Sequence, residues 1–217
     1  MTYIENIFVC IVAPLLVAMI CMGKRYYRFF IFSIAGMGAC ILSAYINTFF
    51  ARIYNADLFN ITTEIAPVVE EIIKLLPLLF FLLIFEPKPK EIESAVLILA
   101  TSFATFENIC YLTQNGAAEL PFLLIRGFGT GAMHVIGGAI TGCGLVYIWK
   151  RGWLKIAGTA GLLCAAINFH AIYNLLIAHG SITQYIAYST PIFVLIVGFM
   201  VRRLIRTKQF SSIKLEI

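Results

Sequence analysis

The stretch APVVEEIIKLL, residues 66–76, places two adjacent carboxylates, Glu70 and Glu71, and the ammonium of Lys74 inside a mostly apolar run. With its flanks the run covers residues 61–85, which is long enough for a membrane-spanning helix. A charged side chain near the centre of such a helix costs at least about 2.5–3.5 kcal/mol. Three charges within five positions therefore need partners, protons or water, and we expect the partners to lie on other spans.

The whole chain has the composition of a polytopic membrane protein. Of its 217 residues, 61% are hydrophobic and only 12% are charged, with a mean hydropathy of +0.92, whereas soluble domains are about 25% charged. Each crossing takes about 20 apolar residues, so the sequence predicts one domain, 1–217, folded as an all-α transmembrane bundle of about seven spans. The predicted spans are residues 4–22, 29–50, 61–85, 92–112, 120–149, 154–178 and 182–201.

The net charge of +5 reports topology rather than nucleic-acid binding, because the basic residues sit in short clusters between apolar runs. One set of loops and the tail hold Lys24, Arg25, Arg28, Lys88, Lys90, Lys150, Arg151, Lys155, Arg202, Arg203, Arg206, Lys208 and Lys214. The opposite loops hold only Arg52. The positive-inside rule therefore predicts an external N-terminus and a cytoplasmic C-terminus. Lys74 and Arg126 lie within spans and need a separate explanation.

Neither a disulfide framework nor a cleaved leader is predicted. The six cysteines, Cys10, Cys21, Cys40, Cys110, Cys143 and Cys164, lie singly in apolar segments without a C-x-x-C spacing. The first apolar run has Glu5 near its start and its basic residues after it, which fits a retained span better than a signal peptide.

Four predicted spans carry ionisable residues at membrane depth. At 1.5 Å per residue, Glu70 and Glu71 lie about 14 Å below the outer end of their span, Glu107 about 8 Å and His170 about 12 Å. His134 lies about 21 Å down if its span begins at residue 120, and less if it begins later. We expect all of them to share one layer of the bundle.

Spacing within the spans supports this layer. Residues four apart share a helix face, as Glu70 does with Lys74 and His170 with Asn174. Pro67 is expected to bend or restart its helix just before Glu70. Two G-x-x-x-G spacings around His134 are expected to let neighbouring helices approach closely, namely Gly127 with Gly131 and Gly138 with Gly142.

Each residue taken alone has a structural explanation, as a hydrogen-bonded core histidine or a buried ion pair. The coincidence on four spans favours function. Acid and histidine chains inside membranes also serve as proton relays, so a proton-coupled transporter is one alternative, although no internal symmetry typical of transporters is visible. A non-catalytic membrane scaffold is the other, and it should tolerate the loss of the acidic pair.

At these residues the chain resembles the PrsW-type intramembrane proteases, a family in one superfamily with the CAAX prenyl endoproteases and bacteriocin-processing proteins. The segment EEIIK, residues 70–74, matches the family's E-E-x-x-K, and FATFEN, residues 103–108, matches F-x-x-x-E-N. His134 follows in a Gly-rich run, and HAIYN, residues 170–174, matches H-x-x-x-N. The motif-bearing core is about residues 61–178.

The resemblance implies hydrolysis of a peptide bond by a multi-pass protein of the bacterial cytoplasmic membrane. In characterised relatives the substrate is a single-pass anti-sigma factor, cut on its extracytoplasmic side as the first step of regulated intramembrane proteolysis. The implied partners are such a substrate and the lipid bilayer, without nucleic acid.

Two catalytic schemes fit the candidate residues. In the metal-free scheme Glu70 is the general base, Glu71 orients it, His134 helps to hold the water, and His170 with Asn174 faces the oxyanion. In the zinc scheme His134, His170 and Glu71 are ligands, water takes the fourth position and another glutamate is the base. The supporting residues are Lys74, Glu107 and Asn108. The sequence does not choose between the schemes.

Overall fold

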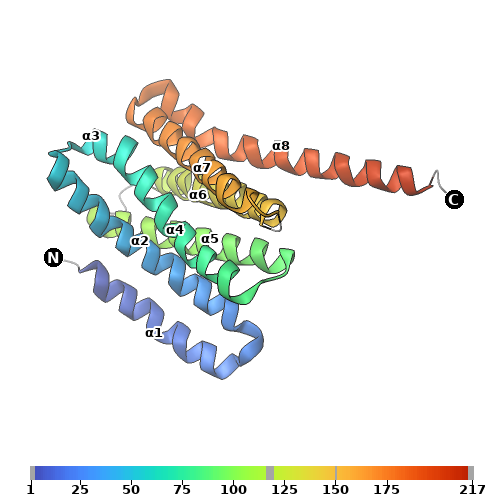
Figure 1. Cartoon of the computed structure of the whole chain (residues 1–217). Coiled ribbons are helices and arrows are strands. Elements are labelled where there is room, and N and C mark those ends of the chain that lie inside the picture. Colours follow the sequence, from blue (N-terminus) through green and yellow to red (C-terminus); the bar gives the residue numbers. More distant parts are fainter. Residues whose placement is uncertain (1–2, 116–119, 150, 215–217) are drawn as a thin grey trace.

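A computed structural model of the chain describes residues 3–115, 120–149 and 151–214 (Figure 1). Its secondary structure in these ranges is helical, without strands. The α-helices are α1 (Ile4–Met22), α2 (Tyr27–Tyr54), α3 (Leu58–Asn60), α4 (Ala66–Phe85), α5 (Pro89–Asn115), α6 (Leu120–Ile148), α7 (Leu154–Ala178) and α8 (Ser181–Lys214). A 3-10 turn, η1 (Lys24–Tyr26), precedes α2, and a π-helical turn, η2 (Ile61–Ile65), precedes α4.

Within the described residues, six helices are long and apolar enough to cross a membrane: α1, α2, α5, α6, α7 and the first part of α8, up to Met200. The predicted all-α bundle is thus confirmed, with six candidate spans in place of about seven. The seventh prediction, residues 61–85, corresponds to η2 and the 20-residue α4. α4 is as apolar as the other helices, and what sets it apart from the six is that it carries three charged residues, Glu70, Glu71 and Lys74.

The helices form a layered bundle in which α4 turns its charged residues Glu71 and Lys74 toward the inside. α2 packs most extensively against α5, α5 against α6, and α6 against α7. α1 lies along α2 at one side of the molecule, and α8 lies at the opposite side with its C-terminal part extending beyond the other helices (Figure 1). α4 contacts α2, α5 and α7, so that residues on three other helices can reach its polar side chains.

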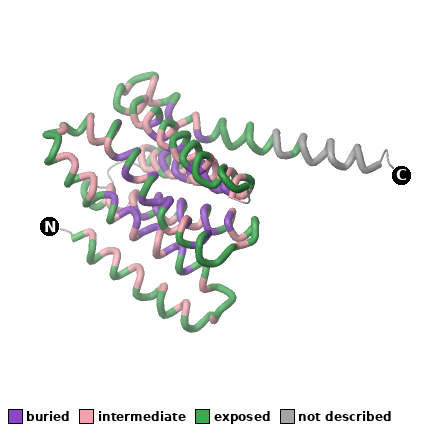
Figure 2. Tube along the Cα trace, in the orientation of Figure 1, coloured by how far each residue is buried: buried purple, intermediate pink, exposed green. Residues whose placement is uncertain are grey.

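The core is apolar and centred on α4, α5 and α6. Its largest fully buried apolar side chains are Phe103, Phe106, Leu82, Leu99, Met133, Leu145 and Val96. Figure 2 shows the buried positions gathered in these inner helices, whereas α1 has no buried residue. One apolar face of α1 nevertheless packs against the core, through the partly buried residues Ile4, Ile7, Phe8, Ile11, Val12 and Leu15.

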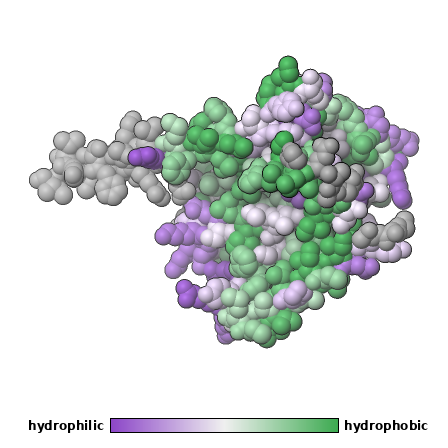
Figure 3. All heavy atoms as spheres, turned by 180° about the vertical axis from the view of Figure 1, so that it is seen from behind, coloured by the Kyte–Doolittle hydropathy of each residue, from purple (hydrophilic) through white to green (hydrophobic). Residues whose placement is uncertain are grey.

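Much of the outer surface is apolar, which suits a lipid environment rather than water. Figure 3 shows hydrophobic residues covering a large part of one face, with hydrophilic residues toward its margins. The exposed large apolar side chains include Ile20, Phe49, Phe80, Leu83, Ile156, Ile182, Phe193 and Phe199.

Pro67 acts at a change of helix type. The chain passes from the π-helical η2 directly into α4, and Pro67 lies in the first turn of α4. The N–H of Ala66 still bonds to the carbonyl of Ile61, so the chain is continuously helical here, and Pro67, which has no N–H, leaves a carbonyl of η2 without its helical donor. α4 begins at Ala66, and Glu70 follows Pro67 by about one turn, close to where the sequence predicts a bend or restart.

Only the second of the two glycine pairs packs a neighbouring helix closely. A Cβ added at Gly138 would lie 2.7 Å from Ala100 Cβ, and one at Gly142 would lie 2.7 Å from Val96 Cγ2, both on α5. A Cβ at Gly127 would meet nothing within 4 Å, and one at Gly131 would meet only an amide nitrogen at 3.9 Å. The close approach of α6 to α5 therefore occurs on the α6 turns that follow His134.

The predicted orientation of the termini stays a prediction. Lys150, one of the cations that support it, and Gly116, in the predicted turn after the fourth span, lie outside the described residues.

Candidate active site

The two adjacent glutamates of α4 point in different directions. Glu71 is buried, with its side chain 4% exposed, and its Oε1 lies 2.5 Å from Nζ of Lys74, one turn along the helix. Glu70 is 13% exposed and lines a cleft. Because successive residues on a helix are turned by about 100°, one carboxylate faces the packed interior and the other faces the cleft.

His134 of α6 lies between two charged groups and is fully buried. Its Nε2 is 2.6 Å from Oε2 of Glu107 on α5, and its Nδ1 is 3.1 Å from Nζ of Lys74. Its ring also packs on Phe103, with the centroids 5.0 Å apart. These contacts fix the position of the imidazole in the core.

His170 of α7 joins the same group from another direction. Its Nδ1 lies 3.0 Å from Oε1 of Glu71, and its Nε2 lies 4.0 Å from Oε2 of Glu70. The rings of His134 and His170 are 5.0 Å apart and nearly perpendicular. The structure thus brings α4, α5, α6 and α7 together at one ionisable group.

Glu70, His134 and His170 form a set of possible metal ligands. One ligand atom from each lies within 4.8 Å of those of the other two. Oε2 of Glu70 is buried without a hydrogen-bond partner, which is costly for a carboxylate unless a cation or water satisfies it. Two imidazole nitrogens and one carboxylate oxygen are donors that zinc and related divalent metals accept. The residues present therefore fit a metal ion.

The surrounding carboxylates occupy the places of outer partners. A metal-bound histidine usually gives its second ring N–H to a carboxylate or carbonyl, which fixes its tautomer. Glu71 lies within hydrogen-bond distance of Nδ1 of His170, and Glu107 lies within hydrogen-bond distance of Nε2 of His134. The sequence prediction named Glu71 as the metal-binding glutamate, whereas here Glu70 is the carboxylate that lies with both histidines.

The group holds one more acid than it holds permanent cations. Three carboxyl groups, Glu70, Glu71 and Glu107, face Lys74 and Arg126. Arg126 Nη2 lies 3.5 Å from Glu107 Oε1. Buried charges need compensation inside a membrane, and either a proton or a bound cation would supply it at this point.

The structure does not bring the two predicted asparagines into this contact network. Nδ2 of Asn174 donates to the carbonyl oxygen of Thr62 at 2.9 Å, which ties α7 to the π-helical η2. Oδ1 of Asn108 is buried without a partner. The contact of Asn174 is that of a residue that holds η2 in place.

Sequence reasoning missed two residues beside the group. Asn47 of α2 donates from Nδ2 to Oε1 of Glu70 at 3.5 Å, and Arg126 of α6 contacts Glu107. Arg126 was noticed as a cation within a span, but no role was predicted for it. The signal for Asn47 was a lone amide within an apolar span, which has no motif to single it out.

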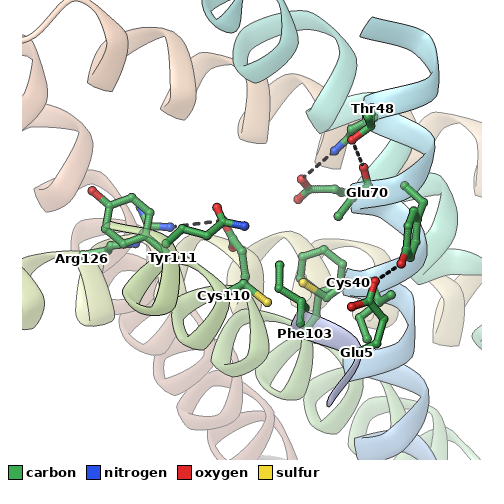
Figure 4. Close-up of a pocket in the computed structure, with 15 residues that line it drawn as sticks. Glu5, Cys40, Thr48, Glu70, Phe103, Cys110, Tyr111 and Arg126 are labelled. Carbon is green, nitrogen blue, oxygen red and sulfur yellow. Dashed lines mark hydrogen bonds and ion pairs between the residues drawn. The ribbon is translucent and has the colours of Figure 1, made fainter. Parts of the chain in front are cut away.

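A cleft leads from the surface to Glu70 and Glu107 (Figure 4). It has a volume of about 390 Å³ and lies among α1, α2, α4, α5 and α6. Figure 4 shows Arg126 and Tyr111 at one side of it and Glu70 and Thr48 at the other. A substrate can therefore reach the carboxylates without crossing the packed core.

Comparison with known proteins identifies one family. The model of the PrsW family intramembrane metalloproteases matches residues 24–201, which is most of the chain and includes every residue named in this description of the candidate site. The resemblance predicted from the four motifs is therefore confirmed. No curated protein and no solved structure matches the chain.

Proposed function

The chain belongs to the PrsW family of intramembrane metalloproteases, a membrane-embedded, multi-pass class, and from this premise we propose that it cleaves single-pass membrane proteins. We propose further that the cut lies near the extracytoplasmic face and that the substrate is of the anti-sigma factor class. The excess of Lys and Arg on one side supports this orientation. In the proposed topology α4 crosses the bilayer as the seventh span, shielded by α2, α5 and α7.

The observation that carries the proposal is the group formed by Glu70, His134 and His170 beside the cleft. We assign these three residues as ligands of a zinc ion. Bound there, zinc would polarise the scissile carbonyl and make a water acidic enough to attack at neutral pH. In this assignment Glu71 is an outer partner rather than a ligand.

The remaining residues of the group orient these ligands. Glu71 accepts a hydrogen bond from Nδ1–H of His170, which leaves Nε2 of that ring toward Glu70. Glu107 accepts from Nε2–H of His134, which leaves the lone pair on Nδ1. Lys74 donates to this nitrogen, which would become a zinc ligand once the ammonium bonds to Glu71 alone. Lys74 pairs with Glu71 and compensates its charge inside the membrane.

Glu107 is the best-placed general base. Its side chain is 29% exposed, compared with 4% for Glu71, and it lines the cleft through which water and substrate arrive. A carboxylate in reach of the attacking water can take its proton and later pass it to the leaving amine. Arg126, next to Oε1 of Glu107, would help to hold that carboxylate in place.

The test uses purified protein and candidate single-pass substrates, with cut products identified by mass. Wild type should cleave, whereas Glu70→Gln and His170→Ala should not. His179→Ala is the matched control, because His179 is exposed at the end of α7, away from the candidate site. This variant should cleave normally. Normal cleavage by Glu70→Gln would overturn the proposal.

Metal content tests the zinc assignment separately. Wild type should carry about one zinc per chain after reconstitution, and His134→Ala should carry much less. Exhaustive chelation should stop cleavage and zinc should restore it. Full activity after chelation would assign the reaction to water activated by Glu70 alone, the metal-free scheme.

A further inference from the structure

The cleft beside Glu70 has two walls with different polar groups, and this inference about its occupant rests on the proposed function. α2 contributes most of one wall, including Asn47, and α5 and α6 contribute the other, including Tyr111 and Arg126. Glu70 and Glu107 reach the cleft from α4 and α5. A peptide lying between the walls would pass the carboxylates of the candidate active site.

The cleft suits an extended segment better than a segment that stays helical. A helix bonds its own backbone groups and surrounds them with side chains, so its scissile bond would be screened from Glu70 and Glu107. An extended segment is narrower and exposes its backbone N–H and C=O groups.

Arg126 supplies hydrogen-bond donors on the α5–α6 wall. Its guanidinium stacks on the ring of Tyr111, with Cζ 3.6 Å from the ring centroid, so its position is defined. Its contact with Glu107 is long, at 3.5 Å, and its Nε is buried without a partner. A guanidinium has five N–H donors, so Arg126 lacks acceptors that a substrate carbonyl would provide.

Asn47 supplies an acceptor on the α2 wall. Its Nδ2 is used on Glu70, while its Oδ1 is buried without a partner. A helix offers no free N–H groups in its middle, because all of them are bonded within the helix. An extended chain presents N–H and C=O groups on both edges, which matches an acceptor on one wall and donors on the other.

The negative charges that line the cleft favour a main-chain carbonyl, rather than an acidic side chain, as the substrate group that accepts hydrogen bonds from Arg126. Glu5, Glu70 and Glu107 line the same cleft, so three carboxylates would repel an incoming Asp or Glu. A neutral carbonyl meets no such repulsion and still accepts from the guanidinium.

We propose that this cleft binds an extended segment of the substrate through its main chain. Arg126 donates to a carbonyl and Asn47 accepts from an N–H, on either side of the bond to be cut. Both are substrate-positioning residues. The proposal predicts that substrates with apolar residues next to the cleaved bond are accepted, whereas substrates with Asp or Glu there are cleaved poorly.

The first experiment measures KM and kcat with the best-cleaved peptide from the assay above as the probe. Arg126→Ala should raise KM about 10- to 100-fold, the usual effect of losing hydrogen bonds from a charged group. Its zinc content should equal that of wild type. Arg52→Ala, which removes an exposed guanidinium from the end of α2, should leave KM and kcat unchanged. An unaltered KM in Arg126→Ala, or zinc loss with unaltered KM, would overturn the role.

The second experiment replaces single amides of the probe by esters, which removes one N–H at a time. One ester near the cut should weaken cleavage by wild type about tenfold but should not weaken it further in Asn47→Ala, because both changes remove the same hydrogen bond. Additive losses at every position would refute the Asn47 contact. If wild type cleaves no peptide at all, the proposed function fails, and this inference fails with it.

Discussion

Nζ of Lys74 lies 3.1 Å from Nδ1 of His134 and 2.5 Å from Oε1 of Glu71, so a single buried ammonium joins α4 to α6. Lys74 is only 5% exposed. Replacing it by Met would leave Glu71 as an uncompensated charge, and breaking a buried pair in this way costs about 3–5 kcal/mol. Denaturant unfolding in detergent should show this loss for Lys74→Met. The double variant Lys74→Met with Glu71→Gln should recover most of the stability and none of the activity.

Glu107→Gln should weaken metal binding without unfolding the protein. The amide keeps the shape of the side chain, but it is a poorer acceptor for the Nε2–H of His134. Loss of such an outer partner typically lowers metal affinity 10- to 100-fold. Zinc competition with a chelating dye measures the change, and Glu91→Gln, on the same helix but at its other end, serves as the control. Equal zinc affinity in Glu107→Gln and wild type would contradict the assigned outer role.

Metal removal should lower thermal stability as well as activity. A ligand that binds only the folded state stabilises it by about 2.7 kcal/mol when present at 100 times its Kd. Zinc added to chelated wild type should therefore raise Tm, and it should leave Tm unchanged in His134→Ala and His170→Ala. An equal zinc-dependent shift in those variants would place the metal elsewhere.

Gly142 should not tolerate a side chain, whereas Gly127 should. A Cβ at Gly142 would lie 2.7 Å from Val96, which is itself fully buried, so Gly142→Ala should destabilise by about 1–3 kcal/mol through overpacking. Gly127 has nothing within 4 Å of the same position, and Gly127→Ala should be neutral or stabilise by roughly 0.5–1 kcal/mol. Unfolding curves of the two variants measured side by side test the difference.

Much of the fold followed from the sequence because hydropathy and length define membrane helices almost by themselves. The predicted spans correspond to the observed helices, and α1 and α7 have the predicted bounds. Three helices, α2, α5 and α8, run several residues further, as α5 does from Pro89 to Asn115 instead of 92–112. Those extra turns are polar and carry no hydropathy signal. The π-helical η2 could not be predicted, because it depends on how α4 docks against α2 and α7.

The candidate site was predictable in its members but not in its contacts. Charged side chains are costly in contact with lipid, so those on different spans were expected to contact one another. The structure brings together Glu70, Glu71, Lys74, Glu107, His134 and His170. Which of two neighbouring glutamates faces the histidines depends on the rotation of α4, which the sequence does not give. Asn47 and Arg126 depend on how α2 and α6 line the cleft.

The opposite facings of Glu70 and Glu71 constrain the length of α4 more tightly than its composition. Side chains on its outer surface, such as Leu76 and Leu83, touch little of the core and are free to vary among apolar types. Inserting or deleting one residue between Glu71 and Lys74, however, would turn the ammonium by about 100° away from its carboxylate. This segment is therefore expected to evolve by substitution alone, because an insertion or deletion would turn the residues that follow it away from their partners in the candidate site.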